Sequence, residues 1–338
     1  MSGPSSHPRA STALPVEGAT GIPAHFGARR YYAWNDWVRQ AHGGRLQKVS
    51  VDAGFTCPNR DGSAGRGGCS FCNNLAFTPG YLREQRDILA QLDTGIGFMR
   101  RRYPDTRGYL AYFQAYSNTY SGVAELRALY ERALSHPQVI GLAIGTRPDC
   151  LPDEVLDYLA ELAERCVLEL EIGIESCDDG VLQACGRGHD FACTVDALQR
   201  AAQHGLPVTG HLLLGLPGET RDSIRAGARA LAELPLAALK FHQLQVVRGS
   251  RLALHRKRNP DAVPLLDVQT YLDWVADVLE RMPPTLRVQR LGSEVPPALR
   301  AAPGWDLRLS ALPAMLDAHM RSRGTWQGRL LSVADTAG

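Results

Sequence analysis

The stretch CPNRDGSAGRGGCSFC, residues 57–72, holds three cysteines and separates them with Gly, Asn, Asp and Arg instead of core-forming residues. Cys57, Cys69 and Cys72 have the spacing Cx11CxxC. A closed zinc site needs four ligands, usually in two pairs, whereas three thiolates suit a 4Fe-4S cluster that leaves one iron without a protein ligand. We therefore predict an iron–sulfur cluster on these three cysteines, with a zinc site as the alternative.

Apolar and amphipathic stretches alternate along the chain after residue 29. FACTVDALQRAAQHG (191–205) has apolar residues at helical spacing and Gly205 at a C-cap position. Strands separated by helices pair in parallel through right-handed crossovers, which predicts an α/β fold: an open doubly wound sheet, or a full or partial barrel. Both place chemistry at the carboxyl ends of strands, where the cysteine loop falls. The expected strands are 46–55, 109–116, 139–145, 167–175, 208–215 and 239–247.

The overall composition excludes several classes of protein. The 37 basic and 35 acidic residues nearly cancel, so total charge demands no polyelectrolyte partner. Eight cysteines in 338 residues are too few for a disulfide scaffold. No signal sequence or run of eighteen apolar residues is present, so we expect a cytoplasmic protein with no membrane partner.

Several segments together carry a resemblance to a known family. A strand, a three-cysteine loop and five further strand–helix units resemble the radical S-adenosylmethionine (SAM) superfamily. TRPD and LEIGIES…RGH also resemble the radical SAM domain of the Elongator catalytic subunit, a tRNA modifier. A closer resemblance, to the YhcC-like group of bacterial radical SAM proteins, lies in DAGFTCPNRDGSAGRGGCSFC, YLAYFQAYSNT, GTRPDC, RGHDFAC, HLLLGLPGE and RGTWQG.

The resemblance implies a fold, cofactors and a reaction. We expect a partial (β/α)6 TIM-like barrel over residues 28–290 and a short C-terminal extension, 291–338, that packs on it. Residues 1–27, with 18 Ser, Thr, Pro, Gly or Ala, are expected to be a disordered leader. The implied cofactors are a 4Fe-4S cluster and SAM, which binds the open iron and is cleaved reductively to a 5′-deoxyadenosyl radical. An electron donor such as flavodoxin or ferredoxin is the implied partner.

Three carboxylates share one face of the fourth expected strand. Glu169, Glu171 and Glu175 lie there by two-residue alternation. They cannot all stay ionised in a dry interior, so this face must meet solvent, Arg or Lys, or a cationic ligand. The family pattern makes Glu171 the candidate for a SAM contact. The alternative is an edge strand with one solvated face.

Three other residues are candidate SAM contacts by resemblance. Gln114 ends the second expected strand, where related enzymes hold the SAM amino group. Gly215 lies in a turn that resembles the segment beside the adenine, although the sequence alone equally suits an ordinary turn. Arg187 can clamp a carboxylate of SAM or substrate, or its segment can serve only as the start of the helix that Asp190 caps.

Lysine usage singles out one further pair. The chain has three lysines against 34 arginines, and Lys240 lies in an expected strand beside His242 on the same face. An ammonium with an adjustable pKa next to an imidazole suits a substrate or proton-transfer site, so we predict a catalytic role for both. The alternative is a solvated barrel edge.

The sequence does not identify the substrate. The basic segments HRKR (255–258) and RRY (101–103) are short and belong to no RNA-binding module. A small molecule or protein is therefore the favoured substrate, with radical modification of tRNA as the alternative enzyme and a zinc- or cluster-bearing binding protein as the non-enzyme alternative. Cys150 and Cys193 lie in family-like motifs, so a redox role stays open for them.

Overall fold

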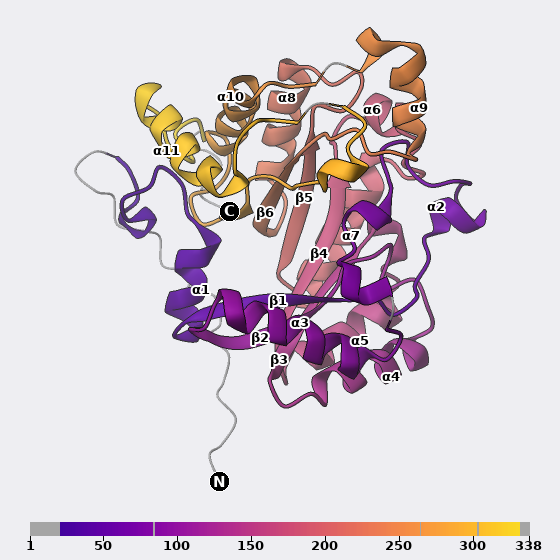
Figure 1. Ribbon diagram of the computed structural model, residues 1–338. Helices are drawn as coiled ribbons and strands as arrows, with labels where there is room; N and C mark the ends of the chain where they lie inside the picture. The colour runs from indigo at the N-terminus through magenta and orange to yellow at the C-terminus, as the bar shows by residue number, and fades with distance from the viewer. Residues whose placement is uncertain (1–20, 84, 264, 303, 332–338) are drawn as a thin grey trace.

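The computed structural model describes residues 21–83, 85–263, 265–302 and 304–331, and in this part of the chain seven strands form one parallel sheet (Figure 1). Each strand pairs with the next along the chain. Because the order never reverses, as it does in a doubly wound sheet, the sheet curls into a half-barrel with its helices outside. The strands are β1 (Arg45–Val51), β2 (Thr106–Phe113), β3 (Val139–Thr146), β4 (Val167–Glu175), β5 (Val208–Leu214), β6 (Leu236–Gln243) and β7 (Arg287–Arg290).

The partial barrel and all six expected strands are confirmed, with shifted ends. The first strand stops at Val51, not at residue 55, and the sixth runs over Leu236–Gln243, not over 239–247. The expected number of six is wrong, because β7 adds a seventh strand that pairs with β6. Its sequence, RVQR, holds one apolar residue in four and therefore carries almost no strand signal.

Strand residues alternate between a helix-facing and a barrel-facing side. In β6, Leu239 and Phe241 are buried in the main apolar core, whereas Lys240 and His242 line the barrel interior. The outer helices thus cover apolar side chains, and the barrel interior is left polar. The helices are α1 (Trp34–His42), α2 (Pro58–Asp61), α3 (Ile88–Arg102), α4 (Val123–Leu134), α5 (Asp153–Ala163), α6 (Asp179–Ala184), α7 (Phe191–Gln203), α8 (Arg221–Ala232), α9 (Arg251–Arg258), α10 (Val268–Leu279) and α11 (Leu312–Ser322).

The two ends of the described chain meet beside β7. Val288 donates its backbone N–H to the carbonyl of Tyr32. The Gln327 side chain accepts from the Tyr32 N–H at 2.9 Å and donates to the Leu286 carbonyl at 2.7 Å. Phe26, in a short 3-10 turn, is only 2% exposed. The expected disordered leader is therefore wrong for residues 21–27, and its first twenty residues lie outside the described part.

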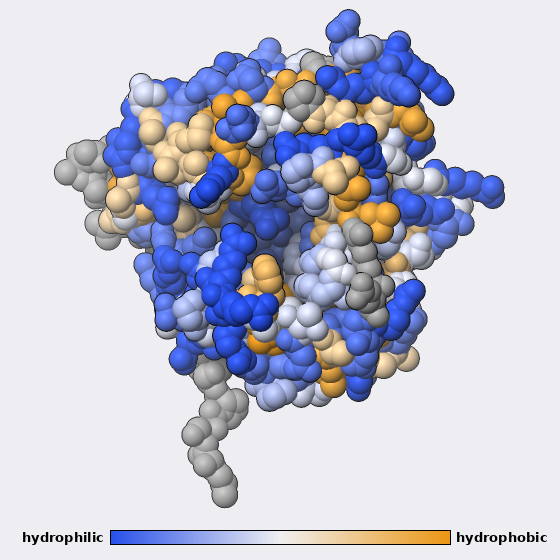
Figure 2. Space-filling model, viewed as in Figure 1, coloured by the Kyte–Doolittle hydropathy of each residue, from blue (hydrophilic) through white to orange (hydrophobic). Residues whose placement is uncertain are grey.

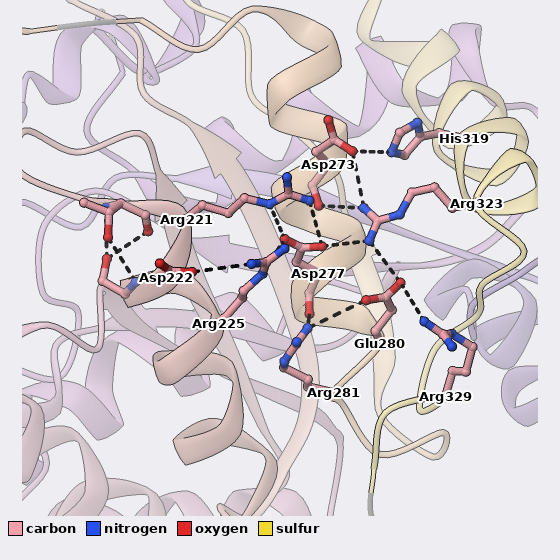
Figure 3. A network of polar contacts seen from close by, with 12 residues as sticks. Arg221, Asp222, Arg225, Asp273, Asp277, Glu280, Arg281, His319, Arg323 and Arg329 are labelled. Atoms are coloured by element: carbon pink, nitrogen blue, oxygen red, sulfur yellow. Dashed lines mark hydrogen bonds and ion pairs between the residues drawn. The ribbon is translucent and has the colours of Figure 1, made fainter.

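Buried Asp277 ties the C-terminal segment to the barrel helices (Figure 3). Its carboxylate, on α10, accepts from Arg221 and Arg225 of α8 and from Arg323, just after α11. Burial opposes its charge, but the three guanidinium groups lower the pKa of Asp277 to about 2. The C-terminal segment thus packs on the barrel, whereas the domain boundary at residue 290 stays a prediction.

Among the described residues, no helix has both the length and the apolar character needed to span a membrane.

Candidate active site

A cavity of about 240 Å³ opens at the carboxyl ends of the strands. Figure 2 shows it as a deep hollow lined by hydrophilic residues. Two non-glycine residues at its wall, Tyr116 and Glu175, have left-handed backbones with φ of 65° and 67°. Strain of this kind persists where the surroundings impose it, and it is common at functional sites. The lining includes the three clustered cysteines together with Gln114, Arg147, Glu171, Arg187, His211, Lys240, His242 and Arg290.

Cys57, Cys69 and Cys72 all line this cavity, and none forms a disulfide. The loop that carries them folds tightly on itself: a Cβ on Gly65 would lie 2.1 Å from the Asn59 side-chain oxygen. Burial, with the charges of the other two thiolates, raises the pKa of Cys72 to about 11. Mutual repulsion of thiolates is relieved when a metal centre binds them, so these side chains fit a cluster chemically.

A single metal ion and a 4Fe-4S cluster require different separations between thiolate ligands. Thiolates on one tetrahedral zinc lie roughly 3.8 Å apart, given a Zn–S bond of about 2.3 Å. In the described part of the chain, no three His, Cys, Asp or Glu side chains are grouped closely enough to hold one metal ion. Thiolates of a 4Fe-4S cluster bind different irons and are spread more widely.

The Cys69 sulfur has two polar neighbours. Arg187 donates from Nη1 to Sγ at 3.6 Å, and the Asn59 amide donates at 3.4 Å. Nη2 of Arg187 donates to the Gly173 carbonyl at 2.6 Å and lies 3.6 Å from Glu175. Burial opposes the Arg187 charge, but Cys69 and Glu175 raise the pKa of this guanidinium. Arg187 therefore contacts the loop of the three cysteines, residues 57–72, here called the cluster loop. The sequence did not predict this contact.

Arg147, which the sequence analysis passed over, braces Arg187. It donates from Nε and Nη2 to Asp149 at 2.8 and 2.6 Å, and from Nη1 to the Arg187 carbonyl at 2.8 Å. The motif GTRPDC contained the signal, since an Arg two residues before an Asp can form this bidentate pair. Cys150, from the same motif, and Cys193 line a separate pocket that none of the three clustered cysteines lines.

Glu171 lies at the centre of an interior ion-pair layer. Its carboxylate is fully buried and 2.5 Å from Lys48 Nζ, 2.7 Å from Lys240 Nζ and 2.9 Å from His211 Nε2. Tyr112 also donates its hydroxyl at 2.6 Å. Burial alone would raise the pKa of Glu171, but Lys240, Lys48 and His211 hold it well below its usual range. Of the three expected ways to keep this face ionised, namely solvent, Arg or Lys, or a cationic ligand, the structure shows lysines.

The pKa values of the two lysines in this layer shift in opposite directions. Burial lowers the pKa of Lys240 to about 7, against the opposing effect of Glu171. Lys48 also lies 2.6 Å from Glu169, and the two carboxylates together raise the pKa of Lys48 despite burial. The two pKa values differ because Lys240 pairs only with Glu171, which it shares with Lys48, whereas Lys48 pairs with both Glu169 and Glu171.

Three of the four predicted SAM contacts line the cavity: Gln114, Glu171 and Arg187. Gly215, which directly follows β5, is not among the lining residues, although Leu213 of β5 is. The Gly215 turn is held by Glu219, whose carboxylate accepts from the Gly215 N–H at 2.8 Å and the Ser176 hydroxyl at 3.1 Å. Burial raises the pKa of Glu219 to about 7.

These features define a class of protein. The profile of the radical SAM superfamily matches residues 59–231, and that of the radical SAM C-terminal domain matches residues 236–321. The chain belongs to the radical SAM superfamily.

Individual relatives agree with this assignment. The chain is 34% identical to the uncharacterized protein YtqA of Bacillus subtilis, over 89% of this chain and 92% of the relative. It is also 34% identical to the protein YhcC of Escherichia coli, over 87% of this chain and 93% of the relative. The expected YhcC-like resemblance is confirmed.

The archaeal Elp3 of Methanocaldococcus infernus has the same fold. Its solved structure superposes with a TM-score of 0.66 and 17% identity, over 83% of this chain and 64% of the Elp3 chain. This likeness confirms the Elongator-type fold.

Proposed function

We propose that this protein is a radical SAM enzyme that holds a 4Fe-4S cluster on Cys57, Cys69 and Cys72. We further propose that it cleaves SAM reductively to act on a small-molecule or protein substrate. The observation that carries this proposal is that the three thiols and the polar barrel interior line one cavity. A reduced cluster held by these cysteines would supply one electron to the SAM sulfonium, and cleavage of the S–C5′ bond would give methionine and a 5′-deoxyadenosyl radical able to take a hydrogen atom from the substrate.

The residues at the cavity wall would position SAM between the cluster loop and the barrel interior. Gln114 would accept a hydrogen bond from the SAM amino group, and the Arg187 guanidinium would bind its carboxylate. Gly215, which is not among the lining residues, would leave room for the adenine through its turn, which has φ of 91°.

Glu171 was assigned to SAM by the family pattern, and its four protein partners compete with that contact. Glu175 is an additional candidate, because it lines the cavity at the end of β4 with its side chain 17% exposed.

Lys240 and His242 would act on the substrate side of the cavity. Both face the barrel interior, and burial lowers the pKa of both side chains, to about 7 for Lys240 and well below the usual range for His242. A Lys with this pKa can accept or donate a proton near neutral pH. We therefore propose that the pair moves protons on the substrate before or after hydrogen abstraction.

The proposal includes an external electron donor such as flavodoxin or ferredoxin, and a cytoplasmic location. Radical modification of tRNA is less favoured. Arg256, in the basic segment 255–258, donates to the carbonyls of Pro260 and Val263, so part of that segment's charge serves the local fold.

The test is anaerobic reconstitution followed by iron analysis and SAM cleavage with a chemical reductant. The wild-type chain should hold about four irons and form 5′-deoxyadenosine. Alanine at Cys57, Cys69 or Cys72 should abolish both, whereas Cys166→Ala, in a buried site away from the cavity, should retain them. A full cluster with activity in any of the three variants, or one bound zinc in the wild type, contradicts the proposal.

A further inference from the structure

Arg290 is a cationic residue of the cavity that the proposed function leaves without a role. It is the last residue of β7, and its ladder partner across the sheet is Lys240. Its side chain lines the cavity, and in the described part of the chain no carboxylate lies within ion-pair distance of it. An arginine in a protein stays charged, and because Arg290 is exposed, water solvates its guanidinium until an anion takes the place of that water.

The neighbouring ion-pair layer does not neutralise it. Lys48 and Lys240 carry two positive charges at most, and Glu169 and Glu171 carry two negative charges. These four groups pair with one another and none of them forms an ion pair with Arg290, so the layer gives its guanidinium no direct partner. Its field acts on the layer, because it adds to the lowering of the pKa of Lys240 that burial begins.

His242 supplies a second group without a partner. Its Nε2 is buried and has no hydrogen-bond partner among the described residues. The ring lies 5.4 Å from the His211 ring, and both line the same cavity as Arg290. A buried ring nitrogen left unpaired costs about 1–3 kcal/mol, so a ligand atom that meets it binds more tightly.

We propose that Arg290 and His242 form a subsite for an oxoanion, a carboxylate or phosphate group of the substrate, at the carboxyl ends of β6 and β7. The guanidinium binds the two oxygens of such a group bidentately, and the neutral imidazole donates from Nε2. This inference rests on the proposed function, since it assigns the chemistry of the substrate of that same site.

The location favours a small ligand. Arg290 is an exposed residue that lines a cavity of about 240 Å³, whereas an RNA backbone is normally bound by a run of several basic residues along a surface. The substrate class is therefore a small acid or phosphate ester, or an acidic side chain that enters the cavity.

Calorimetry with simple probes tests the subsite. The reconstituted full-length protein, saturated with SAM so that the SAM carboxylate occupies its own contacts, is titrated with inorganic phosphate and with succinate at constant ionic strength. We expect saturable binding of at least one probe, and which of the two binds distinguishes a phosphate from a carboxylate site. Arg290→Gln should weaken it about tenfold or more, and His242→Phe should weaken it by a smaller factor.

Two further variants keep the result interpretable. Arg290→Lys should retain part of the affinity, and Arg229→Gln, which removes an exposed charge from the last turn of α8, should retain all of it. Equal affinity in wild type and Arg290→Gln, or binding of tRNA alone, overturns the subsite. Cluster content and SAM affinity are measured on the same samples, so their loss in the wild type instead contradicts the proposed function.

Discussion

The guanidinium of Arg187 lies 3.6 Å from the sulfur of Cys69, although 118 residues separate them in the chain. A hydrogen-bond donor beside a cluster ligand stabilises the more negative, reduced state.

Removing this donor should therefore make the cluster harder to reduce. One hydrogen bond of about 1 kcal/mol corresponds to roughly 40 mV for one electron, and we expect Arg187→Gln to lower the reduction potential by that amount. A redox titration followed by electron paramagnetic resonance measures it. Arg66→Gln removes an exposed charge from the same loop and should leave the potential nearly unchanged. An unaltered potential in Arg187→Gln would show that the contact is only structural.

Glu171→Gln should destabilise the fold, because two buried lysines lose their shared carboxylate. Breaking a buried ion pair from one side costs about 3–5 kcal/mol, which urea denaturation can resolve. Glu161→Gln, in an exposed pair with Arg127, is the control and should have little effect. A variant with unchanged stability but weaker SAM binding would instead support the direct SAM contact that the family pattern implies.

Glu219 should give the protein a pH-dependent stability. Its pKa is raised from 4.5 to about 7, mainly by burial, so between these values the folded chain holds a proton that the unfolded chain has lost. Stability therefore falls as pH rises through this window, by at most about 3 kcal/mol. Glu219→Gln cannot ionise, so its free energy of unfolding minus that of the wild type should be larger at pH 8 than at pH 5. The same difference at both pH values would mean that Glu219 titrates normally.

Asp277→Asn should loosen the C-terminal segment. The substitution removes the charge that binds Arg221, Arg225 and Arg323, and the partly exposed arginines limit the cost to about 2 kcal/mol. Limited proteolysis should cut near α11 earlier than in the wild type. Asp222→Asn provides a matched control, since Asp222 is exposed and contacts only Arg225 of these arginines. If the rate of proteolysis does not change, α11 is held to the barrel by its apolar contacts and not by the Asp277 ion pairs.

The alternation of strands and helices predicted a parallel α/β fold, and the resemblance to the radical SAM superfamily selected the partial barrel. Each of the first six strands has enough β-type residues to be seen locally, whereas β7 depends on pairing with β6 and was missed. Asp190 was expected to cap α7, and its side chain does accept from the Cys193 N–H.

The site was predicted less completely, because its contacts are remote in sequence. Glu171 meets Lys48 across 123 residues and Lys240 across 69, and no local pattern carries that information. His211 is the first residue of HLLLGLPGE, and Arg290 is one of 34 arginines. Nothing in the sequence distinguishes either residue from others of its type. The assignments of Gln114, Glu171, Arg187 and Gly215 to SAM stay predictions.

The interior location of Lys48 and Lys240 leaves Lys257 as the one exposed lysine of the chain. Among the lysines, a bulky amine-reactive dye should therefore label the native protein at Lys257, which provides an attachment point on α9 without cysteine chemistry near the cluster loop. A reagent too large for the cavity reaches the two interior amines only when the sheet opens, so their rate of modification by such a reagent reports on the opening of the barrel.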